Sequence, residues 1–283
     1  MRDPMTAPPQ LLVYAHSWGL LELPRGRPAW SFEEALGQVA AAGFHGVQAE
    51  PERGRKILGA GLRFAAGGRA QDIAGIDALV SRSADAGAHC LTMHLGWGDE
   101  DDEAADRLVD ATLDAAQRHS IPVLIETHRA TIAQDLWRTN RIIERIPQIR
   151  FNGDYSHYYV AQEVPYRGFA AFRQQIQPVL ERTAFFHGRV SNGQCIQVSI
   201  ADPVQQPHLE NFRELWRSAM QHWRQHAGPG DVLPFVPELG PPSAGYAITL
   251  LDESGARREL ADRWGETLQL KAIAEELWRS LEQ

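Results

Sequence analysis

Several short apolar runs in this sequence end on an ionisable side chain, and such a side chain needs a partner if it is buried. The last four of these runs end on or next to Glu126, Asp154, His187 and Glu238. Three carboxylates gathered at one place repel one another, and a divalent cation supplies the missing positive charge. The set therefore predicts one divalent metal ion. Its oxygen-rich donors favour Mn²⁺, Mg²⁺ or Co²⁺, and Zn²⁺ is also compatible.

Other side chains near the run ends widen the candidate site. We expect six of them to contact a substrate: His16, Trp18, His94, His128, His157 and Arg189. Glu50 ends the second run and is a weaker candidate, whereas the third run, ending near Ala66, contributes nothing ionisable. Aromatic side chains such as Trp18 and Trp97 suit the apolar faces of sugar rings, although ordinary loop packing would also explain them.

Each ligand candidate also has a purely structural interpretation. Glu126 could form a structural ion pair with Arg129 or Arg150. Asp154 could serve solely as the N-cap of a helix. The histidines could be hydrogen-bonded core residues, and Glu238, between prolines, could lie in a surface turn. Their joint placement at the ends of separate apolar runs favours a shared site.

Eight apolar runs alternate with segments of helical periodicity. The runs are 11–16, 44–50, 61–66, 89–95, 122–128, 149–154, 183–188 and 233–239. The predicted helices are 31–43, 73–87, 103–119, 169–182, 211–226 and 270–281, with a short, weaker one in 51–60. Ser31 and Glu34 form a capping-box pattern at the first helix.

This alternation predicts an α/β fold with a single (β/α)₈ TIM barrel over residues 11–283, preceded by a flexible tail, 1–10. No G-x-G-x-x-G follows the first run, which disfavours a dinucleotide-binding sheet. In a barrel the carboxyl ends of all strands meet at one rim, so the polar run ends would converge there. The long 189–208 loop is expected to cover the site.

Composition narrows the function classes. The net charge of −8 and the dispersed basic residues disfavour a nucleic-acid partner. No apolar run approaches the roughly 18 residues of a membrane span, and the first ten residues lack the apolar core of a signal peptide. Two isolated cysteines, Cys90 and Cys195, predict no disulfide framework and favour the reducing cytoplasm.

With these residues in this order, the sequence resembles the xylose isomerase-like barrel superfamily of sugar isomerases, ketose epimerases and inosose dehydratases. The resemblance spans roughly residues 11–281. Its motifs are IETH (125–128), GDYSH (153–157), FFHGR (185–189) and PELG (237–240). It implies that Glu126, Asp154, His187 and Glu238 hold one metal, and that Glu126 and Glu238 also move a proton through an enediolate. His94 and His157 match positions near the substrate, and members often form dimers or tetramers.

Two departures from the family pattern stand out. Epimerases place a substrate-binding Arg several residues after the metal-binding His, where this chain has Gly193, and the nearest basic residue is Arg189. The related endonucleases need an Asp-x-His pair after the seventh strand. Asp202 and His208 have the wrong spacing for that pair, which argues against DNA cleavage.

Three functions remain open at this stage. The first is a metal-dependent isomerase or epimerase of a small sugar or polyol-derived carbonyl compound. The second is a lyase or dehydratase of a keto-sugar, inosose or 3-keto-glycoside, for which His94, His128 or His157 could supply a third acid. The third is a barrel that binds a carbohydrate or a partner protein without catalysis, which the complete ligand set disfavours.

Overall fold

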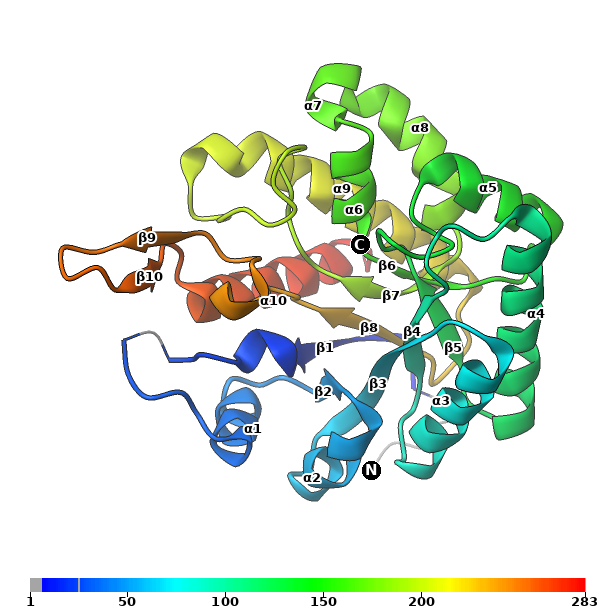
Figure 1. Cartoon of the computed structure of the whole chain (residues 1–283), viewed down its shortest axis with the longest axis horizontal. Helices are drawn as coiled ribbons and strands as arrows, with labels where there is room; N and C mark the ends of the chain where they lie inside the picture. The colour runs from blue at the N-terminus through cyan, green and yellow to red at the C-terminus, as the bar shows by residue number, and fades with distance from the viewer. Residues whose placement is uncertain (1–6, 25, 283) are drawn as a thin grey trace.

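The computed structural model describes residues 7–24 and 26–282, and its centre is a closed barrel of parallel strands (Figure 1). In chain order the strands are β1 (Gln10–His16), β2 (Gly46–Ala49), β3 (Arg63–Ala70), β4 (Leu91–Leu95), β5 (Val123–Glu126), β6 (Phe151–Gly153), β7 (Thr183–His187) and β8 (Val232–Val236). Each strand pairs with the next in sequence, and β1 pairs with β8 to close the barrel. The predicted fold class is confirmed.

Helices surround the barrel (Figure 1). They are α1 (Phe32–Ala41), α2 (Gly54–Gly59), α3 (Ile73–Asp85), α4 (Asp102–His119), α5 (Leu136–Arg145), α6 (Tyr155–Ala161), α7 (Val164–Arg167), α8 (Phe169–Leu180), α9 (Gln206–His226) and α10 (Arg263–Ser280). All the predicted helical segments are helical, and Ser31 and Glu34 form the expected capping box. The sequence patterns did not predict α5, α6 and α7.

A small antiparallel hairpin between β8 and α10 was also not predicted. Its strands, β9 (Thr249–Leu251) and β10 (Arg257–Glu259), project from the body of the barrel (Figure 1). Short 3₁₀ turns complete the description: η2 (Trp18–Leu20), η3 (Pro51–Arg53), η4 (Pro203–Gln205) and η5 (Pro242–Ala244). Of the expected tail, residues 1–6 lie outside the described residues, and Gln10 is already in β1.

Two layers of side chains fill the barrel interior. The lower layer is a buried apolar cluster of Leu12, Tyr14, Ala65, Cys90, Leu124, Phe185 and Val236. Alternate residues of a strand share a face, so the residue two places further along points into the barrel above each of these. On β5 this pairs Leu124 with Glu126, and on β7 it pairs Phe185 with His187. The interior therefore changes from apolar to polar toward the carboxyl ends of the strands.

A larger apolar core lies between the barrel and its helices. Trp216 of α9 is fully buried and meets the ring of Phe235 edge-on, with centroids 5.3 Å apart. Phe235 in turn packs on Phe186 of β7. This packing holds β7 and β8 in place, the two strands whose ends carry His187 and Glu238.

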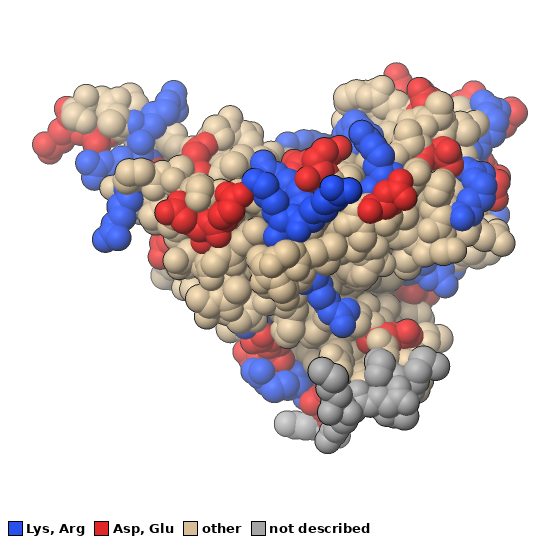
Figure 2. All heavy atoms as spheres, turned by 90° about the horizontal axis from the view of Figure 1, so that it is seen from below, with Lys and Arg blue, Asp and Glu red and all other residues tan. Residues whose placement is uncertain are grey.

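The molecular surface carries charges of both signs. On the face drawn in Figure 2, Lys and Arg side chains lie among Asp and Glu side chains. No helix of the described residues has the length and apolar character that crossing a membrane requires.

The packing beside Phe235 gives a first prediction. A Cβ on Gly188 would overlap the Phe235 ring, which is itself enclosed by the core. We expect Gly188→Ala to lower the free energy of unfolding by about 1–3 kcal/mol through overpacking. Urea denaturation measures the change. The control is Gly37→Ala inside α1, where a Cβ meets nothing within 4 Å. It should stabilise the protein by about 0.5–1 kcal/mol, and equal effects of the two variants would contradict the prediction.

Candidate metal centre

The structure brings the four predicted metal ligands together in the polar layer of the barrel. Glu126 and His187 are the last residues of β5 and β7, Asp154 follows β6 directly, and Glu238 lies two residues beyond the end of β8. One ligand atom from each of the four lies within 4.8 Å of the other three, and all four side chains are buried.

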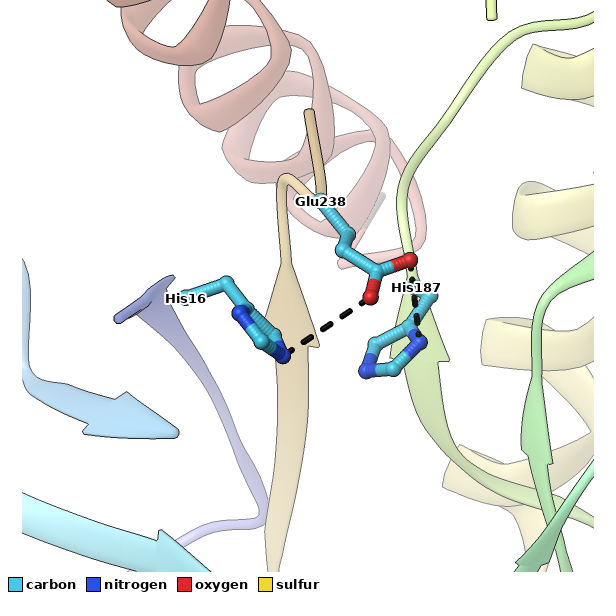
Figure 3. Close-up of side chains that lie close together, drawn as sticks. All are labelled: His16, His187 and Glu238. Carbon is cyan, nitrogen blue, oxygen red and sulfur yellow. Dashed lines mark ion pairs between the residues drawn. The ribbon is translucent and has the colours of Figure 1, made fainter. Parts of the chain in front are cut away.

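His187 lies at the centre of this group. Its Nδ1 is 3.3 Å from Glu126 Oε1 and 3.4 Å from Glu238 Oε2. On the other side of Glu238, His16 places its Nε2 3.7 Å from Oε1 (Figure 3). The carboxylate of Glu238 thus lies between two imidazoles that come from β1 and β7.

A hydrogen-bond chain sets the orientation of His187. Its Nε2 donates to Gln48 Oε1 at 2.8 Å, and Gln48 Nε2 donates to Thr92 Oγ1 at 2.6 Å. With Nε2 engaged by Gln48, Nδ1 faces the carboxylates. Metal-binding histidines are commonly held by such a bond through the nitrogen that does not bind the ion.

Glu126 is held in its ionised form. Its Oε2 accepts from Asn152 Nδ2 at 3.1 Å, and its Oε1 lies 3.0 Å from His94 Nε2. Burial alone would raise the pKa of this carboxyl, but His187 and His94 outweigh burial and hold the pKa well below its ordinary value.

Asp154 caps a helix, as one interpretation of the sequence held, and it also lies among the other candidate ligands. Its Oδ1 accepts from the backbone N–H of Ser156 and caps α6, while its Oδ2 pairs with the guanidinium of Arg189. Arg189 Nη2 also lies 3.0 Å from Glu238 Oε2. Burial would raise the pKa of Asp154, but Arg189 and then His157 bring it well below its ordinary value.

The residues present fit a divalent ion. Among the described residues, His187 Nδ1 and Glu238 Oε2 are buried without a hydrogen-bond partner, and both face the centre of the group. Three carboxylates and one imidazole are hard and borderline donors, suited to Mn²⁺, Mg²⁺ or Co²⁺ and compatible with Zn²⁺. Arg189 offsets one of the three negative charges, so a divalent ion would leave the group neutral.

An open cavity of about 450 Å³ lies against the centre. Four of the predicted substrate contacts line it: His16, Trp18, His94 and His128. The other two, His157 and Arg189, are buried and are not among its lining residues. Arg189 pairs through Nη2 with both Asp154 and Glu238, so it balances charge within the candidate metal centre.

Three of the histidines are stacked beside Glu126. The ring centroids of His94 and His128 are 4.2 Å apart, and those of His128 and His157 are 3.9 Å apart. Burial, with His157 nearby, lowers the pKa of His128 to about 3, so this ring is neutral at physiological pH.

Sequence patterns missed several residues of the site. The prediction that the third strand ends near Ala66 without an ionisable group was wrong. β3 continues to Ala70, and Arg69 lines the cavity. Ala65, Gly67 and Arg69 alternate along one face of β3, and this alternation could have revealed Arg69. However, Gly67 and Gly68 end the apolar run early. Gln48 and Tyr246 also line the cavity and carried no comparable signal.

The protein is a closed (β/α)₈ barrel with a carboxylate–histidine cluster at the carboxyl ends of its strands. The model of the xylose isomerase-like TIM barrel family matches residues 62–235, more than half of the chain. The chain therefore belongs to this family, as the resemblance of its motifs implied. A comparison with curated protein sequences gave no match.

Solved structures share the fold. One is a xylose isomerase-like TIM barrel protein from Mycobacterium smegmatis in complex with magnesium, with 15% identity, 99% of this chain and 100% of that chain covered, and a TM-score of 0.56. The IOLI protein with a bound zinc atom has 10% identity, coverage of 95% and 99%, and a TM-score of 0.55. The probable 3-DHS dehydratase AsbF of Bacillus anthracis has 13% identity, coverage of 84% and 96%, and a TM-score of 0.53. At these identities the likeness concerns the fold alone.

The protonation of His187 predicts how metal affinity depends on pH. Burial would lower its pKa, but Glu126 and Glu238 raise it to about 9 in the metal-free protein. An ion that binds Nδ1 must displace that proton, so we expect affinity for Mn²⁺ to rise between pH 6.5 and 8.5, by up to about tenfold per unit. The same imidazolium stabilises the metal-free fold fully below pH 6.5, and this stability is lost as the pH rises through about 9.

Isothermal titration calorimetry in two buffers of different ionisation enthalpy measures both the affinity and the protons released. We expect about one proton per ion near pH 7. A dissociation constant that stays the same from pH 6.5 to 8.5 would show that His187 does not bind the ion.

The buried guanidinium gives a further prediction. Arg189→Met leaves the buried carboxylate of Asp154 without its partner, which costs about 3–5 kcal/mol of stability in the metal-free protein. Saturating Mn²⁺ should recover part of this loss, because its charge takes over the compensation. Thermal unfolding with and without Mn²⁺ measures both effects.

The control for that variant is Arg107→Met, which removes an exposed pair with Glu103 and should change stability by about 1 kcal/mol or less. If Arg189→Met were no more harmful than Arg107→Met, the guanidinium would not be balancing the buried carboxylates.

Proposed function

We propose that this protein is a metal-dependent isomerase or epimerase that acts on a small sugar or polyol-derived carbonyl compound. The observation that carries the proposal is the convergence of Glu126, Asp154, His187 and Glu238, three of which, all but Asp154, line a cavity of about 450 Å³. A cavity of this volume suits a small molecule. Residues 11–283 would act as one catalytic domain.

In this proposal the four side chains hold one Mn²⁺, Mg²⁺ or Co²⁺, or alternatively Zn²⁺. The bound ion would supply Lewis-acid stabilisation of the negative charge that develops on an enediolate oxygen. Arg189 and Gln48 hold two of these ligands, Asp154 and His187, in place.

Glu126 and Glu238 form the proton-transfer pair of the proposal. Each places one oxygen beside a histidine of the cavity: Glu126 Oε1 beside His94 and Glu238 Oε1 beside His16. An ionised carboxylate can accept the proton of the carbon next to a carbonyl, and the second carboxylate can return a proton to the neighbouring carbon or to the opposite face. His16, Trp18, His94 and His128 are the proposed substrate contacts.

A second candidate, a lyase or dehydratase of a keto-sugar, is favoured by the histidines on the Glu126 side. Loss of a leaving group after proton removal needs a third acid. His94 both lines the cavity and contacts Glu126, so it is the best placed of the three stacked histidines. The same first step, proton abstraction by a carboxylate, serves both reactions.

The test begins with chelated protein reloaded separately with Mn²⁺, Co²⁺, Mg²⁺ and Zn²⁺ and incubated in D₂O with a panel of aldoses, ketoses and inososes. Proton abstraction at carbon should place solvent deuterium next to the carbonyl, detected by NMR. We expect Glu126→Gln and Glu238→Gln each to lower kcat by about 10²–10⁴-fold, because each removes a proton-transfer group.

Glu144→Gln on the exposed face of α5 is the isosteric control and should retain full activity. An isomeric sugar as product supports the isomerase, and a product with the absorbance of a conjugated enone supports the lyase. If no metal restores deuterium exchange with any compound of the panel, the proposal is wrong.

A further inference from the structure

The cavity beside the candidate metal centre is lined by one guanidinium that forms no ion pair within the described residues. Arg189 is matched by Asp154 and Glu238. Glu50, at the cavity rim, faces Arg53 at 3.3 Å. Arg69 lines the cavity, yet no Asp or Glu oxygen of the described chain lies within the 4.0 Å of an ion pair with it.

Arg69 is nevertheless held firmly. Its Nη1 donates to the carbonyl oxygens of Gly96 at 2.7 Å and Ala130 at 2.9 Å. Its guanidinium carbon lies 4.4 Å from the ring centroid of Trp97. These contacts satisfy one end of the guanidinium and cover one of its faces. Within the described residues, Nε has no hydrogen-bond partner.

The nearest carboxylates are occupied by other contacts. Both oxygens of Glu100 accept backbone N–H groups, Oε1 from Trp97 at 2.8 Å and Oε2 from Gly98 at 2.7 Å. Glu126 is reached only through His94, whose Nδ1 lies 3.4 Å from Arg69 Nη2 and whose Nε2 lies 3.0 Å from Glu126. Arg69 therefore stands one side chain away from the candidate metal centre, and Glu126 and Glu100 act on its charge only at longer range than an ion pair.

The charges of the loaded site decide what fits beside Arg69. Three carboxylates, Arg189 and a divalent ion sum to zero. A neutral sugar would leave Arg69 without a direct ion-pair partner, whereas a carboxylate would supply one and match the planar guanidinium in shape. A dianionic phosphate would meet only this single guanidinium and no glycine-rich loop of backbone donors.

Building on the proposed function, we propose that the substrate is a small polyhydroxylated carboxylic acid, a sugar acid or cyclic hydroxy acid, whose carboxylate binds Arg69 while its carbonyl and hydroxyl oxygens face the metal centre. Arg69 is then a specificity-determining residue that selects acids over neutral sugars of the same size.

The experiment compares quinate, a polyhydroxylated cyclohexane carboxylate, with myo-inositol, a neutral ring of similar size, and with myo-inositol 1-phosphate. Each is titrated calorimetrically into Mn²⁺-loaded wild-type protein, Arg69→Gln and Arg69→Lys. We expect the wild type to bind quinate at least tenfold more tightly than myo-inositol. In Arg69→Gln the dissociation constants for quinate and myo-inositol should differ by no more than about twofold. Arg69→Lys should retain an intermediate preference for quinate.

Arg63→Gln is the matched control, because Arg63 is exposed at the opposite end of the same strand. It should keep the full preference for quinate. Circular dichroism of each variant verifies folding, and elemental analysis should find one Mn²⁺ per chain in all of them.

Each outcome has a defined meaning. Equal binding of quinate and myo-inositol by the wild type, including no measurable binding of either, overturns the inference, as does a preference that survives in Arg69→Gln. If myo-inositol 1-phosphate gains as much affinity over myo-inositol as quinate does, or more, the choice of a carboxylate is overturned. Metal content near zero refutes the proposed function separately, since it is measured without any substrate.

Discussion

The structure depends on the compensation of three buried carboxylates inside the barrel. Burial by itself favours the neutral form of a carboxyl group, yet Glu126 and Asp154 are held ionised by the cations around them. One fixed guanidinium, Arg189, and one titratable imidazole, His187, make the largest contributions to that compensation, and His94 and His157 add to it. The fixed charge stays with the fold, while the titratable one can exchange its proton for a metal ion. Folding and the proposed metal binding would therefore depend on the same electrostatic balance.

The remaining side chains of the centre orient the charged groups by hydrogen bonds. Gln48 and Thr92 orient the ring of His187, and Asn152 orients Glu126. Asp154 links the centre to α6, since the carboxylate that faces Arg189 also caps that helix. The bond by which Asp154 caps α6 therefore also fixes the position of its charged carboxylate. The structural interpretation of this residue is confirmed by the cap, and its role as a metal ligand stays a prediction.

Much of this arrangement could be predicted from sequence because it follows strand periodicity. The eight apolar runs mark the strands, and a barrel brings their ends to one rim, so the convergence of Glu126 and His187 follows from the fold class. The extent of β3 could not be read in the same way, since Gly67 and Gly68 interrupt its apolar pattern and hide Arg69. Tyr246 reaches the cavity from the segment before the hairpin, a long-range contact without local signal. The helix α5 was missed although its buried residues Leu136, Thr139, Ile142 and Ile143 recur at helical spacing, so this miss has no physical cause in the sequence.

The two-layered interior has a consequence for how such a molecule can change over evolutionary time. Leu124 and Phe185 pack in the lower layer, and Glu126 and His187 stand two residues further along the same strands. Replacing a residue of the upper layer leaves the contacts below it in place. Substitutions above the lower layer, for example at Arg69, can thus change the substrate preference during evolution while the apolar lower layer of the barrel stays the same.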